Sequence, residues 1–142
     1  MPNDFFNSYP EFIKKGINEV LQYCKEKDVI LAIEETPPIV VEFVNKFGSK
    51  HLVIALDTGH VEDAMGELYR AKNHLIHLHV TDVVRPSPDE IDKLIPFYIL
   101  IYILKERGSV NHLVPFEGEI DWKRFETGLK EIGYKGCFMY EG

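Results

Sequence analysis

The chain has 142 residues, of which 45% are hydrophobic and 27% charged, a composition typical of one globular domain with a sizeable core. Lysine and arginine number 16 against 23 aspartate and glutamate, a formal net charge of −7, so the basic surface that nucleic-acid binding requires is lacking. The two cysteines have no C-x-x-C spacing, which argues against a disulfide framework and against a thiolate zinc site.

The N-terminal residues lack the basic stretch and apolar core of a secretory signal, so we expect a cytoplasmic protein with reduced thiols. The longest apolar run, residues 94–104, is shorter than the roughly 20 residues of a membrane helix. We therefore expect no membrane association.

Helical and strand patterns alternate from the beginning of the chain. Ser8 and Pro10 mark a helix start, and apolar residues at helical spacing predict an amphipathic helix over residues 9–27. A continuous apolar run over residues 29–33, stopped by E-E-T-P-P, predicts a strand that is buried on both faces and ends at Glu34. The first unit is therefore a helix followed by a buried strand.

The same unit repeats along the chain. The further predicted elements are helices over residues 38–47, 61–72 and 121–132, and strands over residues 51–56, 75–80 and 137–140. Helices that alternate with buried strands favour βαβ units and a parallel α/β sheet. We expect a single domain over residues 1–142.

Residues 84–110 interrupt this order. They contain the turn and helix start R-P-S-P-D-E and the apolar run, and we interpret them as an inserted helical segment. Because nearly every face of that helix is apolar, it must be covered. Three interpretations stand: a core helix of the same domain, a subunit contact, or a lid over a site.

Polar residues with metal-binding side chains recur where the predicted strands end: Glu34, Asp57, His79 and Glu141. In a parallel α/β sheet the carboxyl ends of the strands form the edge that binds ligands, and in a barrel they ring one mouth. Three carboxylates and one imidazole favour Mn²⁺, Mg²⁺ or Co²⁺, with Zn²⁺ as an alternative. The sequence therefore predicts a site for one divalent cation. Asp82, by contrast, is expected to cap the segment that follows it.

Several stretches of the chain resemble a known family. They are L-A-I-E-E-T-P-P, I-A-L-D-T-G-H, I-H-L-H-V-T-D and H-L-V-P-F-E-G-E-I-D-W with its trailing G-Y-K-G-C-F-M-Y-E. In this order they are similar to the xylose isomerase-like barrels, which include sugar epimerases, hydroxypyruvate isomerase, inosose dehydratase and endonuclease IV. The resemblance implies a parallel (β/α) half-barrel of a TIM barrel, with strands equivalent to the fifth to eighth and an inserted apolar helix.

The resemblance also implies roles for individual residues. Glu34, Asp57, His79 and Glu141 match the metal ligands, while His60 and His112 match histidines that contact the substrate. The implied activity is that of a divalent-metal-dependent sugar or sugar-phosphate isomerase or epimerase, in which Glu34 and Glu141 transfer protons through an enediolate. The expected partner is a small-molecule carbohydrate.

Two departures from the family leave alternatives open. Val110 stands where the family has Asp, which disfavours the third metal of an endonuclease IV-like phosphodiester hydrolase using the same ligands with His60 and His112. Barrels of this kind need eight strands and about 250 residues. We therefore expect a homodimer, or pairing with a missing N-terminal half, to close the barrel. A non-catalytic truncated barrel or scaffold is the remaining alternative.

Overall fold

The computed structural model describes residues 10–34, 38–85 and 110–140. The helices are α2 (Glu11–Lys27), α3 (Pro38–Phe47), α4 (Ala64–Ala71) and α7 (Trp122–Glu131). The strands are β1 (Leu31–Glu34), β2 (Leu52–Asp57), β3 (Leu75–Val80), β4 (Asp82–Val84), β5 (Val110–Leu113) and β6 (Cys137–Tyr140). The predicted alternation of helices and strands is confirmed, with most boundaries within one to three residues.

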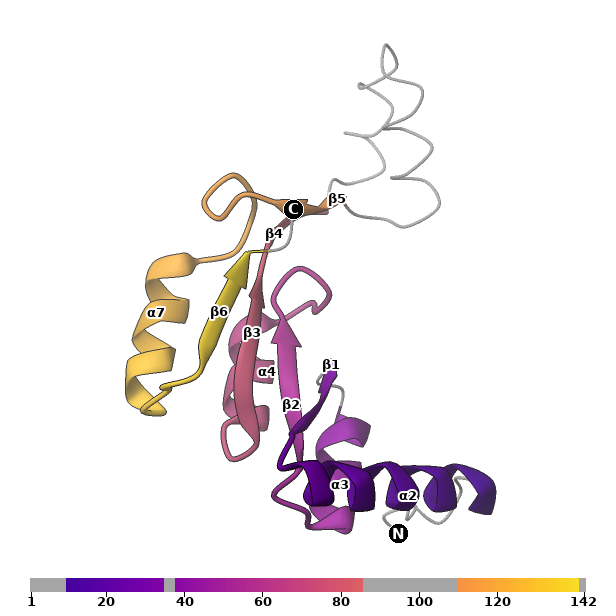
Figure 1. The fold of residues 1–142 in the computed structure, drawn as a ribbon. Coiled ribbons are helices and arrows are strands. Elements are labelled where there is room, and N and C mark those ends of the chain that lie inside the picture. Colours follow the sequence, from indigo (N-terminus) through magenta and orange to yellow (C-terminus); the bar gives the residue numbers. More distant parts are fainter. Residues whose placement is uncertain (1–9, 35–37, 86–109, 141–142) are drawn as a thin grey trace, which may run out of the picture.

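Four strands form one parallel sheet in the order β1-β2-β3-β6. All four arrows point the same way, so their carboxyl ends lie along one edge of the sheet (Figure 1). Helices connect the successive strands, as parallel pairing requires. This confirms the α/β class and the parallel sheet of a partial TIM barrel.

The hydrophobic core lies between one face of this sheet and the helices. Alternate residues of a strand share a face, and Leu52, Ile54 and Leu56 of β2 all belong to the core cluster. The helices contribute the buried side chains Leu21, Phe43, Val44, Leu68, Trp122, Phe125 and Leu129. The opposite face of β2 therefore carries Val53, Ala55 and Asp57.

The outer strands β1 and β6 are the edges of the sheet. In β1, Ala32 and Glu34 are exposed while Leu31 and Ile33 are half-buried, and every residue of β6 is exposed. The prediction that the strand over residues 29–33 is buried on both faces is wrong, because β1 lies at the edge of the sheet and the described helices pack against one face of that sheet. Among the four strands of this sheet, β2 alone is buried along its whole length.

The sequence did not indicate the short strands β4 and β5. They pair antiparallel, with Asp82 opposite Leu113 and Val84 opposite Val110, and lie beyond the carboxyl edge of the main sheet (Figure 1). This pairing brings together Val84 and Val110, the two ends of the segment that interrupts the order of helices and strands. Most of the predicted inserted segment, residues 84–110, lies outside the described residues, and its two ends, Val84 and Val110, belong to β4 and β5. In the part of the chain that is described, no helix has the length and hydrophobicity needed to span a membrane.

Candidate metal centre

The strand register places three of the predicted ligands on one face of the sheet. Asp57 of β2 pairs with His79 of β3, and Glu34 of β1 pairs with Ala55, two residues before Asp57. Because side chains two residues apart share a face, all three project to the side away from the helices. Glu34 lies two residues further from the carboxyl edge than Asp57, and its longer side chain makes up for that distance.

A register shift in β3 makes this arrangement possible. Ile54 pairs with Leu75 but Ala55 pairs with His77, so one residue of β3, Ile76, is passed over. A shift of one residue moves every later side chain to the other face. With regular pairing, Leu78 would stand beside Asp57. The irregularity instead aligns His79 with Asp57 and returns Leu78 to the core.

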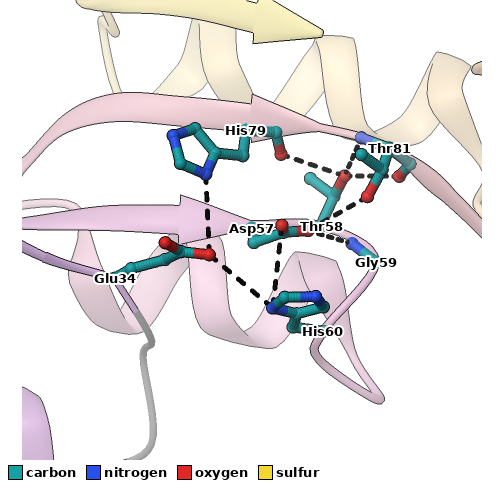
Figure 2. A network of polar contacts seen from close by, with 7 residues as sticks. All are labelled: Glu34, Asp57, Thr58, Gly59, His60, His79 and Thr81. Atoms are coloured by element: carbon teal, nitrogen blue, oxygen red, sulfur yellow. Dashed lines mark hydrogen bonds and ion pairs between the residues drawn. The ribbon is translucent and has the colours of Figure 1, made fainter. Parts of the chain in front are cut away.

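The side chains converge at the carboxyl edge of the sheet, as Figure 2 shows. The Nδ1 atom of His60 lies 3.7 Å from Oε1 of Glu34 and 3.7 Å from Oδ2 of Asp57. On the other side of Glu34, the same Oε1 lies 3.6 Å from Nδ1 of His79. Glu34, Asp57 and His60 each offer one ligand atom within 4.8 Å of the others. This spacing leaves room for a single cation between the two carboxylates, with the imidazole of His60 or that of His79 as a further ligand.

The carboxylate of Asp57 is the buried floor of this cluster. Its Oδ1 accepts hydrogen bonds from the Gly59 amide at 2.8 Å and from the Thr81 hydroxyl at 3.0 Å. Its buried Oδ2 accepts no hydrogen bond from the described residues. A buried carboxylate oxygen without a donor is costly, so this atom favours a positive neighbour. A divalent cation with oxygen ligands fits that requirement.

Exposure of the four side chains rises from the floor to the rim. Asp57 is 1% exposed, His79 18%, His60 32% and Glu34 43%. The buried end of the cluster excludes water and strengthens its electrostatic interactions. The exposed end leaves Glu34 and His60 accessible to a small molecule arriving from solution.

The predicted substrate contacts lie next to each other. His112 of β5 meets His60 edge to face, with ring centroids 5.5 Å apart. The backbone of His112 is left-handed, with φ 62°, a conformation that residues other than glycine adopt at a cost in free energy. The other predicted ligand, Glu141, lies outside the described residues. The structure thus brings five of the six predicted site residues to one place.

Asp82 has a larger structural role than the predicted cap. Its fully buried carboxylate accepts hydrogen bonds from the indole of Trp122 and from four backbone amides, those of Val83, Phe116, Gly118 and Ile120. Burial raises the pKa of Asp82, but the hydrogen bonds from Trp122 and the backbone amides outweigh it and hold that pKa below its ordinary value. Asp82 therefore fixes the loop between β5 and α7.

Sequence reasoning missed the residues that support the cluster. Thr58 and Thr81 are fully buried and link the ends of β2 and β3, because the Thr58 hydroxyl bonds to the backbone of Thr81 and the Thr81 hydroxyl donates to Asp57. Their position directly after strand-end residues was the one available signal. Reasoning from strand ends also left His60 out of the ligand set. In the structure its Nδ1 lies 3.7 Å from Oε1 of Glu34, and Nδ1 of His79 lies 3.6 Å from the same atom.

Comparison with known proteins identifies related sequences. A family model described as a xylose isomerase-like TIM barrel matches residues 5–142. The D-psicose 3-epimerase of Enterocloster bolteae is 24% identical over an alignment of 137 residues, and the match covers 89% of this chain and 38% of the epimerase.

Two solved structures share the fold. The crystal structure of a xylose isomerase domain protein from Planctomyces limnophilus matches with a TM-score of 0.70 at 17% identity, over 95% of this chain and 48% of that one. Apo 3-keto-D-glucoside 4-epimerase from E. coli matches with a TM-score of 0.59 at 13% identity, over 90% of this chain and 44% of the epimerase. The chain thus spans less than half the length of each of these three relatives.

Proposed function

Since the chain belongs to the family of xylose isomerase-like TIM barrels, we propose that it functions as a divalent-metal-dependent sugar isomerase or epimerase. The observation that supports this most is the convergence of Glu34, Asp57 and His60 at the strand ends, with His79 beside them. The similarity to a D-psicose 3-epimerase favours a keto sugar as the substrate class.

Glu34, Asp57, His79 and Glu141 would hold the cation, and the donor set fits Mn²⁺, Mg²⁺ or Co²⁺ better than a metal that prefers sulfur. A bound divalent cation supplies a Lewis acid that polarises the carbonyl of the sugar and so makes the neighbouring C–H more acidic. The unsatisfied Oδ2 of Asp57 supports its assignment, because the atom is buried and carries negative charge.

The exposed residues of the cluster would bind the sugar and transfer protons to and from it. Glu34 is the most exposed member of the cluster, so its carboxylate is positioned to take a proton from the sugar carbon as a general base. Glu141, directly after β6, would return a proton to the carbon. His60 and His112 would orient substrate oxygens through their adjacent rings.

A complete substrate pocket needs more than these four parallel strands. The edge strand β6 carries the exposed apolar residues Phe138, Met139 and Tyr140, and Ala32 of the other edge strand, β1, is exposed as well. Unpaired edges of this kind bind further strands. We propose that a second copy of the chain, or a polypeptide equivalent to the N-terminal half of the barrel, pairs with these edges.

Solvent exchange tests the proposed chemistry. With Mn²⁺ and a panel of ketohexoses in D₂O, we expect loss of the proton NMR signal of the C–H next to the carbonyl, together with appearance of the epimer. Glu34→Gln and Glu141→Gln should abolish exchange, because neither amide accepts a proton from carbon. Glu19→Gln on α2 is the matched control and should exchange like the wild type. Equal exchange in Glu34→Gln and the wild type would reject the proposed base.

A further inference from the structure

The hydroxyl of Thr81 is held in one position at the junction between β3 and β4. The residue is fully buried, and Figure 2 shows its contacts. Its backbone amide donates to Oγ1 of Thr58 at 3.0 Å, and its carbonyl accepts from the same hydroxyl at 2.6 Å. This reciprocal pair fixes the backbone of Thr81 against the end of β2.

From that position Thr81 donates its hydroxyl hydrogen to Oδ1 of Asp57 at 3.0 Å. The amide of Gly59 donates to the same oxygen at 2.8 Å. A Cβ atom on Gly59 would lie 2.3 Å from Oγ1 of Thr81, so only glycine permits this approach. Two buried donors therefore meet on one oxygen of Asp57.

The two donors set the orientation of the whole carboxylate. Rotation about the last bond of an aspartate is otherwise only weakly restricted. With Oδ1 fixed by Thr81 and Gly59, the second oxygen points to the cluster, where Oδ2 stands 3.7 Å from Nδ1 of His60. Rotation would exchange the two oxygens only by breaking both hydrogen bonds.

We propose that Thr81 is a positioning residue that keeps Oδ2 of Asp57 directed at the divalent cation and thereby sets the affinity of the site. This inference rests on the proposed metal site. Hydrogen-bond partners of a ligating carboxylate orient it, and their removal lowers metal affinity by about 10- to 100-fold. A hydroxyl that served packing alone would affect the stability of the fold and leave the affinity unchanged.

Titration of the full chain with Mn²⁺, followed calorimetrically, separates these roles. Thr81→Val keeps the shape and removes the hydroxyl, and we expect its Mn²⁺ affinity to fall by about 10- to 100-fold. Thr81→Ser restores the hydroxyl and should bind within about threefold of the wild type. Thr127→Val, which removes an exposed hydroxyl from α7, is the matched control and should bind like the wild type.

A second variant tests the same contact from the opposite side. Gly59→Ala adds the methyl group that displaces the Thr81 hydroxyl, so it should weaken Mn²⁺ binding as Thr81→Val does. Unfolding midpoints measured without Mn²⁺ verify that each variant is folded. Should Thr81→Val not fold, Gly59→Ala and Thr81→Ser decide the question by their opposite expected effects.

Asp57→Asn distinguishes failure of this inference from failure of the proposed site. If Asp57→Asn loses binding while Thr81→Val and Gly59→Ala bind like the wild type, the metal site stands and the positioning role of Thr81 is overturned. If Asp57→Asn itself binds like the wild type, the proposed metal site fails, and the inference fails with it.

Discussion

Asp82 and Trp122 are 40 residues apart in the chain, yet the indole Nε1 of Trp122 donates to Oδ2 of Asp82 at 2.7 Å. The contact joins the first residue of β4 to the first residue of α7. It fixes the loop between α7 and β5, the strand that carries His112. A residue with no proposed chemical role therefore holds part of the site in place.

Asp82 should be a determinant of acid stability. Its pKa is lower in the folded chain than in the unfolded chain, so its ionised form stabilises the fold above the unfolded value of about 3.9. This contribution is lost as the pH falls through the lower folded value. Asp82→Asn should lose about 2–4 kcal/mol at neutral pH, because hydrogen bonds to a buried charge are lost.

Urea unfolding between neutral and acidic pH measures this effect. The difference in unfolding free energy between the wild type and Asp82→Asn should shrink below about pH 4. Asp28→Asn is the control, since Asp28 caps α2 in a left-handed conformation that asparagine also adopts. A difference that stays constant down to the acid limit would show that ionisation of Asp82 does not stabilise the fold.

The two histidines of the cluster should contribute unequally to cation binding. His79 lies on a strand in register with Asp57, whereas His60 lies in a loop and is more exposed. We expect His79→Ala to lower Mn²⁺ affinity at least about tenfold, and His60→Ala to lower it less. Electron paramagnetic resonance of free Mn²⁺ measures both. The reverse order would make His60 the ligand and His79 its neighbour.

The side chain of His112 should contribute to substrate binding and not to the stability of the fold. Glycine adopts its left-handed backbone without strain, so His112→Gly should unfold within about 1 kcal/mol of the wild type. Removal of the ring beside His60 should raise KM for the sugar in the exchange assay. A stability loss well beyond this range, with KM unchanged, would assign the ring a packing role.

The exposed edge strands predict self-association. Light scattering at micromolar concentration should give the mass of a dimer. Tyr140→Lys places a charge on the edge strand β6 and should shift the equilibrium towards monomer, because lysine on an edge disfavours strand pairing. Tyr23→Lys replaces a comparably exposed tyrosine on α2 and is the control. A monomeric wild type would leave a separate polypeptide as the partner of these edges.

Local sequence patterns were sufficient to predict the helices and strands of the main sheet. The strands Leu75–Val80 and Cys137–Tyr140 and the helix Pro38–Phe47 have the predicted bounds. Asp121, the first residue of the predicted helix over residues 121–132, caps α7 through the amide of Arg124. The strand-end pattern also indicated that Glu34, Asp57 and His79 would lie together.

Features that depend on contacts between distant segments could not be predicted in this way. The register shift at Ile76 is set by how β3 pairs with β2, and no property of Ile76 alone signals it. The pairing of β4 with β5 joins residues on both sides of the interruption. The hydrogen bonds of Thr81 and Asp82 likewise require the folded positions of their partners.

The most direct test of the metal site is a crystal of the full chain soaked in Mn²⁺ and measured for anomalous scattering. We predict one peak per chain, at about 2.0–2.4 Å from carboxylate oxygens of both Glu34 and Asp57. The absence of a peak at the carboxyl edge of β1 and β2, or a peak more than about 4 Å from Oδ2 of Asp57, would contradict the account.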